Sequence, residues 1–259
     1  MKKFKLFAIL SILTLLIAAC GTDKDDTANE SGSEGKVYRV GIDTTYPPFE
    51  FEKDGEYTGI DIDIINAIAE DQGFEIELKP MDFGGIIPSL QAGQLEVAIA
   101  GMSITEDRKK VVDFSDPYFD AGLSLVVAND TDDIEKIEDL AGKRVAVKNG
   151  TTGATFAQEQ EKEHGFDRLV QFNDSPAMFQ EVSNGNAQAL IEDYPVIAYA
   201  IAQNDLGLKV VGERLTGAQY GIAVLKGQND ELLEKINAGL ANLRESGKYD
   251  EILNKYLAE

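Results

Sequence analysis

The stretch DFSDPYFDAGLSLVVAN, residues 113–129, interrupts an otherwise regular alternation of strands and helices. It leads from a polar segment past Pro117 into the apolar strand expected at 123–128, without a helix between them. An extended connection of this kind is typical of a chain that crosses from one α/β unit into another. The alternative interpretation is an ordinary loop inside one sheet.

On both sides of this stretch, apolar residues follow the spacings of helices and strands in turn. Residues 59–71, for example, place Ile60, Ile64, Ala67 and Ile68 on one helical stripe. Repeated βα units predict an α/β protein with mostly parallel sheets. Strands are expected at 37–42, 75–79, 97–100, 123–128, 144–148, 169–172 and 187–191, and helices at 59–71, 85–92, 152–163, 177–183, 195–203, 230–245 and 249–257.

The composition excludes several classes of function. The chain has 259 residues, a net charge of −22, one cysteine and one histidine. Its length suggests one large or two medium domains, because single cores rarely grow past ~250 residues. The acidity argues against binding nucleic acid or anionic lipid headgroups by charge. One cysteine excludes an intramolecular disulfide and a cysteine-based zinc site, and one histidine leaves little room for a histidine metal site. No metal, cofactor or catalytic residue is expected.

The N-terminus has the pattern of a targeting signal. Lys2, Lys3 and Lys5 precede an uncharged run over residues 6–19, which is short for a membrane span of ~20 residues but suits a signal peptide. The residues Ile17-Ala18-Ala19-Cys20 resemble the bacterial lipoprotein cleavage box, which implies a signal peptide over 1–19 and lipidation of Cys20, palmitate included. The alternatives are an ordinary signal peptide or a buried N-terminal helix. Residues 20–36 contain hardly any apolar side chain and predict a flexible acidic tether.

Six segments, in order, resemble the bacterial polar amino-acid-binding lipoproteins of ABC importers, solute-binding protein family 3. The resemblance is closest to the glutamine-binding proteins and covers nearly all of residues 37–259. The segments are GIDTTYPPFEF (41–51), ELKPMDFGGIIPSLQAG (77–93), AGMSITEDRKKVVDFSDPYF (100–119), DLAGKRVAVKNGTTGA (139–154), ALIEDYPVIAYAIA (189–202) and GAQYGIAVLKG (217–227).

The resemblance implies a two-lobed α/β fold of the periplasmic-binding-protein type II, with two hinge strands and the ligand in the interlobe cleft. Lobe 1 would contain residues 37–119 and 220–259, and lobe 2 residues 120–219 with the hinges, near 117–122 and 216–220. It also implies a monomer that is no enzyme, tethered to the extracellular face of the cell membrane. Its partners would be a free L-amino acid, captured by cleft closure, and a membrane permease.

The chemistry of a free amino acid indicates which residue types such a site needs. Burying its carboxylate and its ammonium costs several kcal/mol per ion unless each charge is paired. The planar guanidinium of Arg108 suits a carboxylate in two-point contact, although a surface salt bridge with Glu106 or Asp107 is an alternative. Residues 149–153 lie between a strand and a helix, where free N–H groups attract anions; here the alternative is a plain tight turn.

The resemblance assigns further roles. The Thr152 N–H would join Arg108 on the ligand carboxylate, and Asp193 would pair with the ammonium, although an aspartate before Tyr-Pro also reads as a helix N-cap. Tyr46 and Phe83 would sandwich the aliphatic part of the ligand, although such aromatics are more often core. The full set of expected ligand-binding residues is Asp43, Tyr46, Phe83, Gly101, Ser103, Arg108, Lys148, Thr152 and Asp193, with the Gly101 carbonyl and the Ser103 hydroxyl on the ammonium.

The side-chain end of the ligand would meet Asp43, which accepts hydrogen bonds, and Lys148, which donates them. A carboxamide satisfies both, so glutamine is the expected ligand. Glu192 stands where the closest glutamine binders have histidine, and this extra acid could favour arginine or lysine, point to solvent, or pair across the closed cleft. Two rival functions are a sensor module and a dehydratase-like enzyme that uses Glu192 and Lys148 as an acid–base pair.

Overall fold

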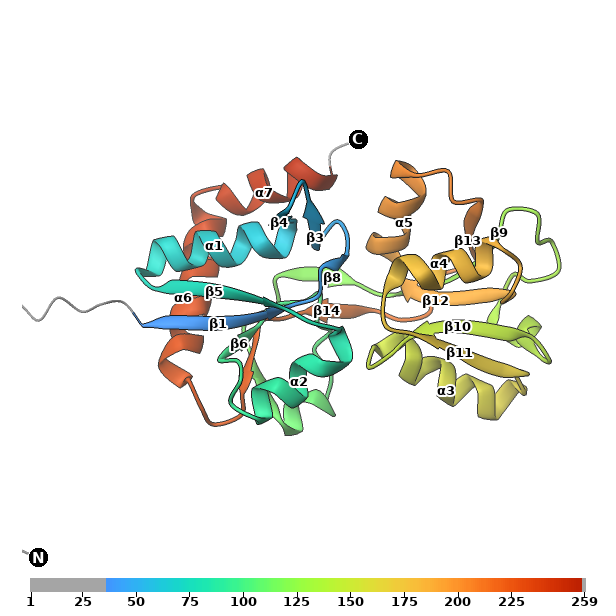
Figure 1. Ribbon diagram of the computed structural model, residues 1–259, viewed down its shortest axis with the longest axis horizontal. Helices are drawn as coiled ribbons and strands as arrows, with labels where there is room; N and C mark the ends of the chain where they lie inside the picture. The colour runs from blue at the N-terminus through green and yellow to red at the C-terminus, as the bar shows by residue number, and fades with distance from the viewer. Residues whose placement is uncertain (1–35, 258–259) are drawn as a thin grey trace, which may run out of the picture. The chain divides into compact units, whose positions relative to one another are not determined.

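A computed structural model of the chain describes residues 36–257 (Figure 1). The expected signal peptide, Cys20 and all but the last residue of the expected tether lie outside the described residues. Among residues 36–257, no helix is both long enough and apolar enough to cross a membrane.

The first lobe is built on a five-stranded sheet with the order β5-β1-β6-β15-β7 (Figure 1). Strand β1 runs parallel to β5 and β6, whereas β15 runs antiparallel to β6 and β7. The elements of this lobe are β1 (Val37–Ile42), β5 (Glu75–Pro80), β6 (Val97–Ala98), β7 (Val112–Phe114), β15 (Ala223–Leu225), α1 (Ile60–Gln72), α2 (Phe83–Gln91), the short 3₁₀ helix η1 (Arg108–Lys110), α6 (Asp230–Glu245) and α7 (Lys248–Leu257).

The second lobe repeats this plan with the order β11-β10-β12-β9-β13. Here β10 runs parallel to β11 and β12, and β9 runs antiparallel to β12 and β13. Its elements are β9 (Leu123–Ala128), β10 (Arg144–Lys148), β11 (Arg168–Phe172), β12 (Ala189–Asp193), β13 (Leu208–Val211), the 3₁₀ helix η2 (Ile137–Leu140), α3 (Thr152–His164), α4 (Ser175–Ser183) and α5 (Tyr194–Gln203).

Two short strands, β8 (Phe119–Ala121) and β14 (Ala218–Tyr220), connect the two lobes and pair with each other antiparallel. The stretch 113–129 therefore runs from β7 of the first sheet through β8 into β9 of the second, as the crossover interpretation predicts. The prediction of mostly parallel sheets is wrong, because half of the strand pairings within the two sheets are antiparallel. The passage of the chain through the hinge explains this difference. A strand that enters a sheet from a hinge, with no helical crossover before it, arrives in the opposite direction.

A small hairpin sheet near the start of lobe 1 was not expected from the sequence. It consists of β2 (Thr45–Tyr46), β3 (Glu50–Lys53) and β4 (Glu56–Thr58), and it pairs Tyr46 with Glu50. The strand expected at 97–100 ends already at Ala98, and the one expected at 187–191 is shifted to 189–193.

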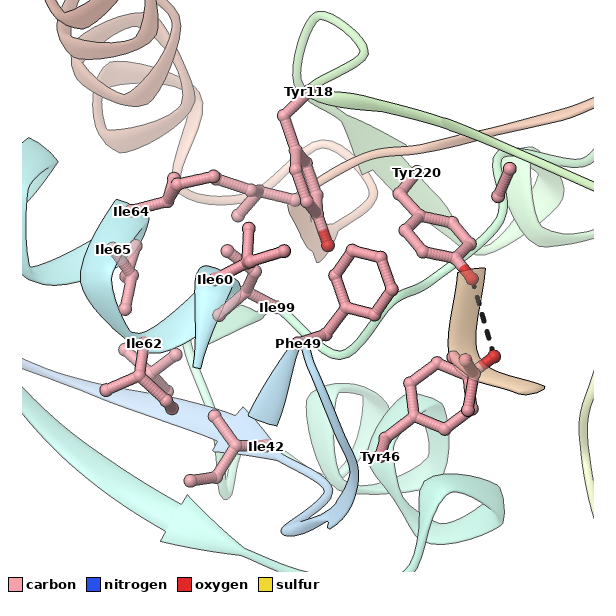
Figure 2. Close-up of a cluster of buried hydrophobic side chains, with 14 of the residues drawn as sticks. Ile42, Tyr46, Phe49, Ile60, Ile62, Ile64, Ile65, Ile99, Tyr118 and Tyr220 are labelled. Carbon is pink, nitrogen blue, oxygen red and sulfur yellow. Dashed lines mark hydrogen bonds between the residues drawn. The ribbon is translucent and has the colours of Figure 1, made fainter. Parts of the chain in front are cut away.

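The core of lobe 1 extends to the hinge. In the predicted stripe of α1, Ile60, Ile64 and Ile68 are at 0% exposure, whereas Ala67 is half-buried. Figure 2 shows Ile60 beside Phe49, whose ring contacts Tyr220 of β14 edge-on with the centroids 5.1 Å apart. This apolar packing supports the hinge from the side of α1 and holds Tyr46 at the edge of the cluster, where the site described below begins.

Candidate functional site

A small cavity lies where the two lobes and the hinge meet. Its volume is about 10 Å³, roughly the space of one water molecule. Eight of the nine expected ligand-binding residues surround it, and Thr151 is the additional one; the lining is Tyr46, Phe83, Gly101, Ser103, Arg108, Lys148, Thr151, Thr152 and Asp193. Side chains of the two lobes contact each other directly here, so the structure describes a closed cleft. A larger cavity of about 340 Å³ adjoins it and shares Ser103, Arg108, Thr151 and Thr152.

Arg108 joins the two lobes at one end of the cavity. Its Nη1 donates to the Ser103 carbonyl at 2.7 Å and its Nη2 to the Gly150 carbonyl of lobe 2 at 3.1 Å. The guanidinium also lies over the Phe83 ring, 5.1 Å from its centroid. Because a guanidinium carries five N–H groups, three remain for a ligand. Burial disfavours the charged form and lowers the pKa of Arg108 to about 10.

The alternative reading of Arg108 as a surface salt bridge is wrong. Glu106 pairs instead with Lys109 at 2.9 Å, and Asp107 pairs with Lys110 at 2.5 Å. The neighbouring lysines thus take the two acids, and the 3₁₀ turn directs Arg108 toward the cavity.

The start of α3 presents backbone N–H groups beside Arg108. Thr151 is the N-cap, and its hydroxyl accepts from the Ala154 N–H at 3.1 Å. Thr152 is the first helical residue, so its N–H has no carbonyl partner inside the helix. The turn is also tight, since Gly150 has φ +76° and a Cβ there would lie 2.8 Å from the Gly84 Cα of lobe 1. The geometry therefore combines the tight turn with a site that attracts a carboxylate.

Asp193 provides a negative charge on the opposite side. Its Oδ2 accepts from the hydroxyls of Tyr46 and Tyr220, both at 2.7 Å, whereas its buried Oδ1 has no hydrogen-bond partner. Asp193 does occupy the N-cap position of α5, as that alternative predicts, but its side chain makes no capping hydrogen bond to the helix. Burial raises the pKa of Asp193 above its usual value, and this favours a cationic partner for the carboxylate.

Tyr220 is a functional candidate that the sequence did not reveal. Its segment is recognised as hinge, but its contact with Asp193 joins residues 27 positions apart and depends on how the hinge strand is oriented.

Gly101 shapes the wall of the cavity beside Tyr46. It adopts φ +51°, and a Cβ at this position would lie 2.6 Å from the Tyr46 ring. A glycine is therefore required for the backbone to approach this ring closely. Ser103, two residues further on, is within 3.5 Å of the Thr152 hydroxyl of lobe 2.

A buried ion pair crosses between the lobes at the other end of the cavity. Lys148 Nζ of β10 lies 2.5 Å from Asp43 Oδ2, and the two side chains are only 2% and 3% exposed. The ammonium group also lies 4.7 Å from the centroid of the Tyr46 ring. Thr45 supports the pair, since its hydroxyl and its N–H both donate to Asp43 Oδ1. Asp43 is the one expected residue that does not line the cavity; it acts there through Lys148.

Glu192 is buried at the end of β12, so the expectation that it could point to solvent is wrong. Its Oε2 accepts from the Ser175 hydroxyl at 3.0 Å, and its Oε1 accepts from the Asp193 N–H at 2.8 Å. The Tyr46 hydroxyl approaches Oε1 from lobe 1 at 3.2 Å. Burial raises the pKa of Glu192 to about 7. Glu192 does not line the cavity, and its oxygens are already occupied by protein donors.

Arg108 and the start of α3 thus provide donors for an anion at one end of the cavity, and Asp193 provides an acceptor for a cation close by. The buried pair of Lys148 and Asp43 lies beyond them. Within residues 36–257, no group of three or more histidine, cysteine, aspartate or glutamate side chains could hold a metal ion.

Comparison with known proteins is consistent with this geometry. Residues 38–259 match the family model of the bacterial extracellular solute-binding proteins, family 3. The chain belongs to this family. Among the other family 3 proteins, the ABC transporter glutamine-binding protein GlnH of Bacillus subtilis is 34% identical over 275 residues, which cover 100% of this chain and 98% of GlnH.

Two solved structures of an ancestral arginine-binding protein are also similar to this family 3 protein. One is bound to arginine and the other to glutamine, and both are 46% identical to this chain. Their TM-scores are 0.82 and 0.80, and each comparison covers 86% of this chain and 98% of the solved one. The two-lobe α/β fold is therefore that of solute-binding proteins.

Proposed function

We propose that this family 3 protein captures a free polar L-amino acid, with glutamine as the preferred ligand, and delivers it to the membrane permease of an ABC importer. The observation that carries the proposal is the convergence of Arg108, the start of α3 and Asp193 on one interlobe cavity, which would have to widen from its volume of about 10 Å³ to admit the ligand. A zwitterion would place its carboxylate on the three remaining Arg108 N–H groups and the Thr152 N–H. Its ammonium would meet the unpartnered Oδ1 of Asp193, with the Gly101 carbonyl and the Ser103 hydroxyl nearby.

The charges at the far end of the cavity favour a neutral side chain. Lys148 and Asp43 already neutralise each other. A carboxamide can donate to the aspartate and accept from the lysine without displacing either. A cationic side chain would instead compete with Lys148 for Asp43, and two positive charges ~4 Å apart repel by about 4 kcal/mol at an effective dielectric constant of 20. Glutamate would bring a third carboxylate close to Asp43 and Glu192.

Arginine is the second candidate, and two observations favour it. One is the buried Glu192, which adds an acid near Lys148. The other is the 46% identity to an ancestral arginine-binding protein that was solved with arginine as well as with glutamine. Against arginine, protein donors already occupy both Glu192 oxygens, and the raised pKa weakens the negative charge of Glu192 near neutral pH.

Ligand capture would occur by lobe closure. Arg108, Gly101 and Ser103 belong to lobe 1, whereas Thr152, Lys148 and Asp193 belong to lobe 2, so only a closed cleft offers both sets of contacts to one small molecule. A ligand that binds both lobes shifts the population toward the closed form, and the permease would recognise that form. The protein would act as a monomer, anchored at the extracellular face of the membrane through lipidated Cys20. We propose no chemical step, so the ligand would be recovered unchanged.

The test is a calorimetric titration with glutamine, arginine, lysine, histidine and glutamate. The proposal expects glutamine to bind at one site with a dissociation constant in the micromolar range, about −8 kcal/mol, and to bind at least tenfold more tightly than arginine. Binding of arginine but not glutamine would overturn the ligand assignment, and binding of none of the five would overturn the proposed function. Recovery of a chemically altered ligand would favour the enzyme reading.

A further inference from the structure

Two carboxyl groups lie behind the cavity and take no part in the contacts described above. Glu50 is on β3 and Asp61 is in the first turn of α1, and both are 0% exposed. The backbone brings the two residues together, because the Asp61 N–H donates to the Phe49 carbonyl at 2.8 Å and Phe49 directly precedes Glu50. Glu50 also pairs across the hairpin with Tyr46, the aromatic wall of the cavity.

One oxygen of Asp61 connects three parts of the lobe. Its Oδ2 accepts from the Gly101 N–H at 2.7 Å and from the Tyr118 hydroxyl at 2.9 Å. Gly101 carries the carbonyl expected to meet the ligand ammonium, and Tyr118 immediately precedes the hinge strand β8. Asp61 thus fixes the cavity wall and the start of the hinge to α1.

The other oxygens of the two acids have no partner. Asp61 Oδ1 and both carboxyl oxygens of Glu50 are buried without a hydrogen bond. The charged groups that act on Glu50 are Asp61, Asp43 and Lys148, and this lysine is already paired with Asp43. Two unpaired ionised carboxylates at zero exposure are strongly unfavourable, whereas one proton on the pair removes one of the two buried charges.

The surroundings indicate which acid holds the proton. Burial and the negative charges of Asp61 and Asp43 raise the pKa of Glu50 well above its usual value. Burial also raises the pKa of Asp61, to about 7, but two donors and the start of α1 stabilise its ionised form. The donor that acts on Glu50 is the backbone N–H of Asp43, and its effect on the pKa is smaller than those of burial and of the two negative charges.

We propose that Glu50 and Asp61 share one proton, with Glu50 as the acid and Asp61 as the carboxylate, and that Asp61 is a positioning residue for the Gly101 carbonyl and the hinge. The positioning role rests on the proposed function, whereas the shared proton does not depend on any ligand.

The shared proton is tested on the ligand-free protein by urea unfolding between about pH 5 and about pH 8. A group whose folded-state pKa is raised stabilises the fold at low pH, and this contribution is lost as pH rises. The ratio of the unfolding constants of wild type and E50Q should therefore increase by up to about tenfold per pH unit above about 4.5. E52Q, an exposed position on the same strand, is the matched control and should show no such trend. Equal profiles for wild type and E50Q would overturn the proposal.

Infrared spectroscopy gives a second readout that is independent of how well E50Q folds. A protonated carboxylic acid has a carbonyl-stretching band distinct from those of carboxylates. We expect such a band in the wild-type protein and in E52Q at neutral pH, and a weaker band in E50Q, where the remainder comes from Glu192, whose pKa is raised to about 7. Its absence from the wild type would overturn the shared proton.

The positioning role is tested by titrating D61A and D61N with glutamine, after their folding has been checked by circular dichroism. D61A removes the acceptor for Gly101 and Tyr118 and should weaken binding at least tenfold, whereas the amide oxygen of D61N retains that acceptor and should restore most of the affinity. Equal affinities of D61A and the wild type, or equal losses in both variants, would contradict the role. If the wild type binds no amino acid, the proposed function and the positioning role fail together, and the two ligand-free measurements still decide the shared proton.

Discussion

Replacing Arg108 by methionine should separate ligand binding from stability. The substitution keeps much of the length of the side chain but removes the N–H groups that the proposed function assigns to the ligand carboxylate. Hydrogen bonds to charged groups contribute about 1.5–3 kcal/mol each, and the start of α3 retains part of the carboxylate contact. We therefore expect R108M to weaken glutamine binding by about 3 kcal/mol, on the order of 100-fold.

The free energy of unfolding should change far less than the binding energy. R108M loses the bonds to the Ser103 and Gly150 carbonyls, each contributing about 1 kcal/mol. This loss is offset because burial lowers the pKa of Arg108 to about 10, which means that the fold disfavours its charge. The net change in the ligand-free protein should be about 1 kcal/mol or less.

The assay is calorimetric titration with glutamine, combined with urea unfolding of the ligand-free variants. R214M is the matched control, because Arg214 also lies over an aromatic ring, 4.2 Å from the centroid of Tyr194, but does not line the cavity. R108K, which keeps the charge but not the fork, should fall between wild type and R108M. Less than threefold loss of affinity in a folded R108M, or an equal loss in R214M, would refute the role of Arg108.

Three further predictions concern the same cavity. K148M leaves the buried carboxylate of Asp43 without its ion-pair partner. The ratio of the affinity for arginine to that for glutamine should therefore rise at least tenfold, as measured by titration of both ligands. An unchanged ratio would contradict the account of selectivity. Burial raises the pKa of Glu192 to about 7, so its stabilising contribution is present at low pH and is lost between about pH 4.5 and 7. The free energy of unfolding of the wild type relative to that of E192Q should therefore fall across this window. A difference that does not change with pH would contradict the raised pKa. G101A places a side chain at a left-handed backbone position and against the Tyr46 ring, which should cost about 1–3 kcal/mol in stability or binding. G85A is the control and should be tolerated, because a Cβ at that position meets nothing within 4 Å. Equal effects of the two variants would contradict the close approach of the Gly101 backbone to the Tyr46 ring.

The sequence reveals the long elements of the fold well. Periodicity is enough for α1 and α6, because each buries one continuous apolar stripe against its lobe. It does not reveal the hairpin of β2, β3 and β4, whose strands have two to four residues and carry charged side chains. The parallel character of the sheets was overestimated because strand direction depends on how the chain returns from the hinge, which no local pattern records.

The candidate site was predictable where one residue type has one plausible task. Arg108 and Asp193 match the two charges of an amino acid, and the structure places both at one cavity. Glu50 and Asp61 escaped notice because in the sequence they read as ordinary surface acids; their burial depends on tertiary packing against Phe49 and Tyr118. The orientation of Glu192 was open for the same reason, since Ser175 and Tyr46 reach it from other elements.

The central claim is that the closed cavity recognises both charged groups of a free amino acid. It is tested most directly by calorimetric titration of the wild type with glutamine, N-acetylglutamine and glutamine α-amide, which carry both charges, only the carboxylate and only the ammonium. The account predicts one-site binding of glutamine and at least 100-fold weaker binding of each blocked derivative, because each leaves Asp193 or Arg108 without its partner. Equal binding of the three compounds, or no binding of glutamine, would contradict it.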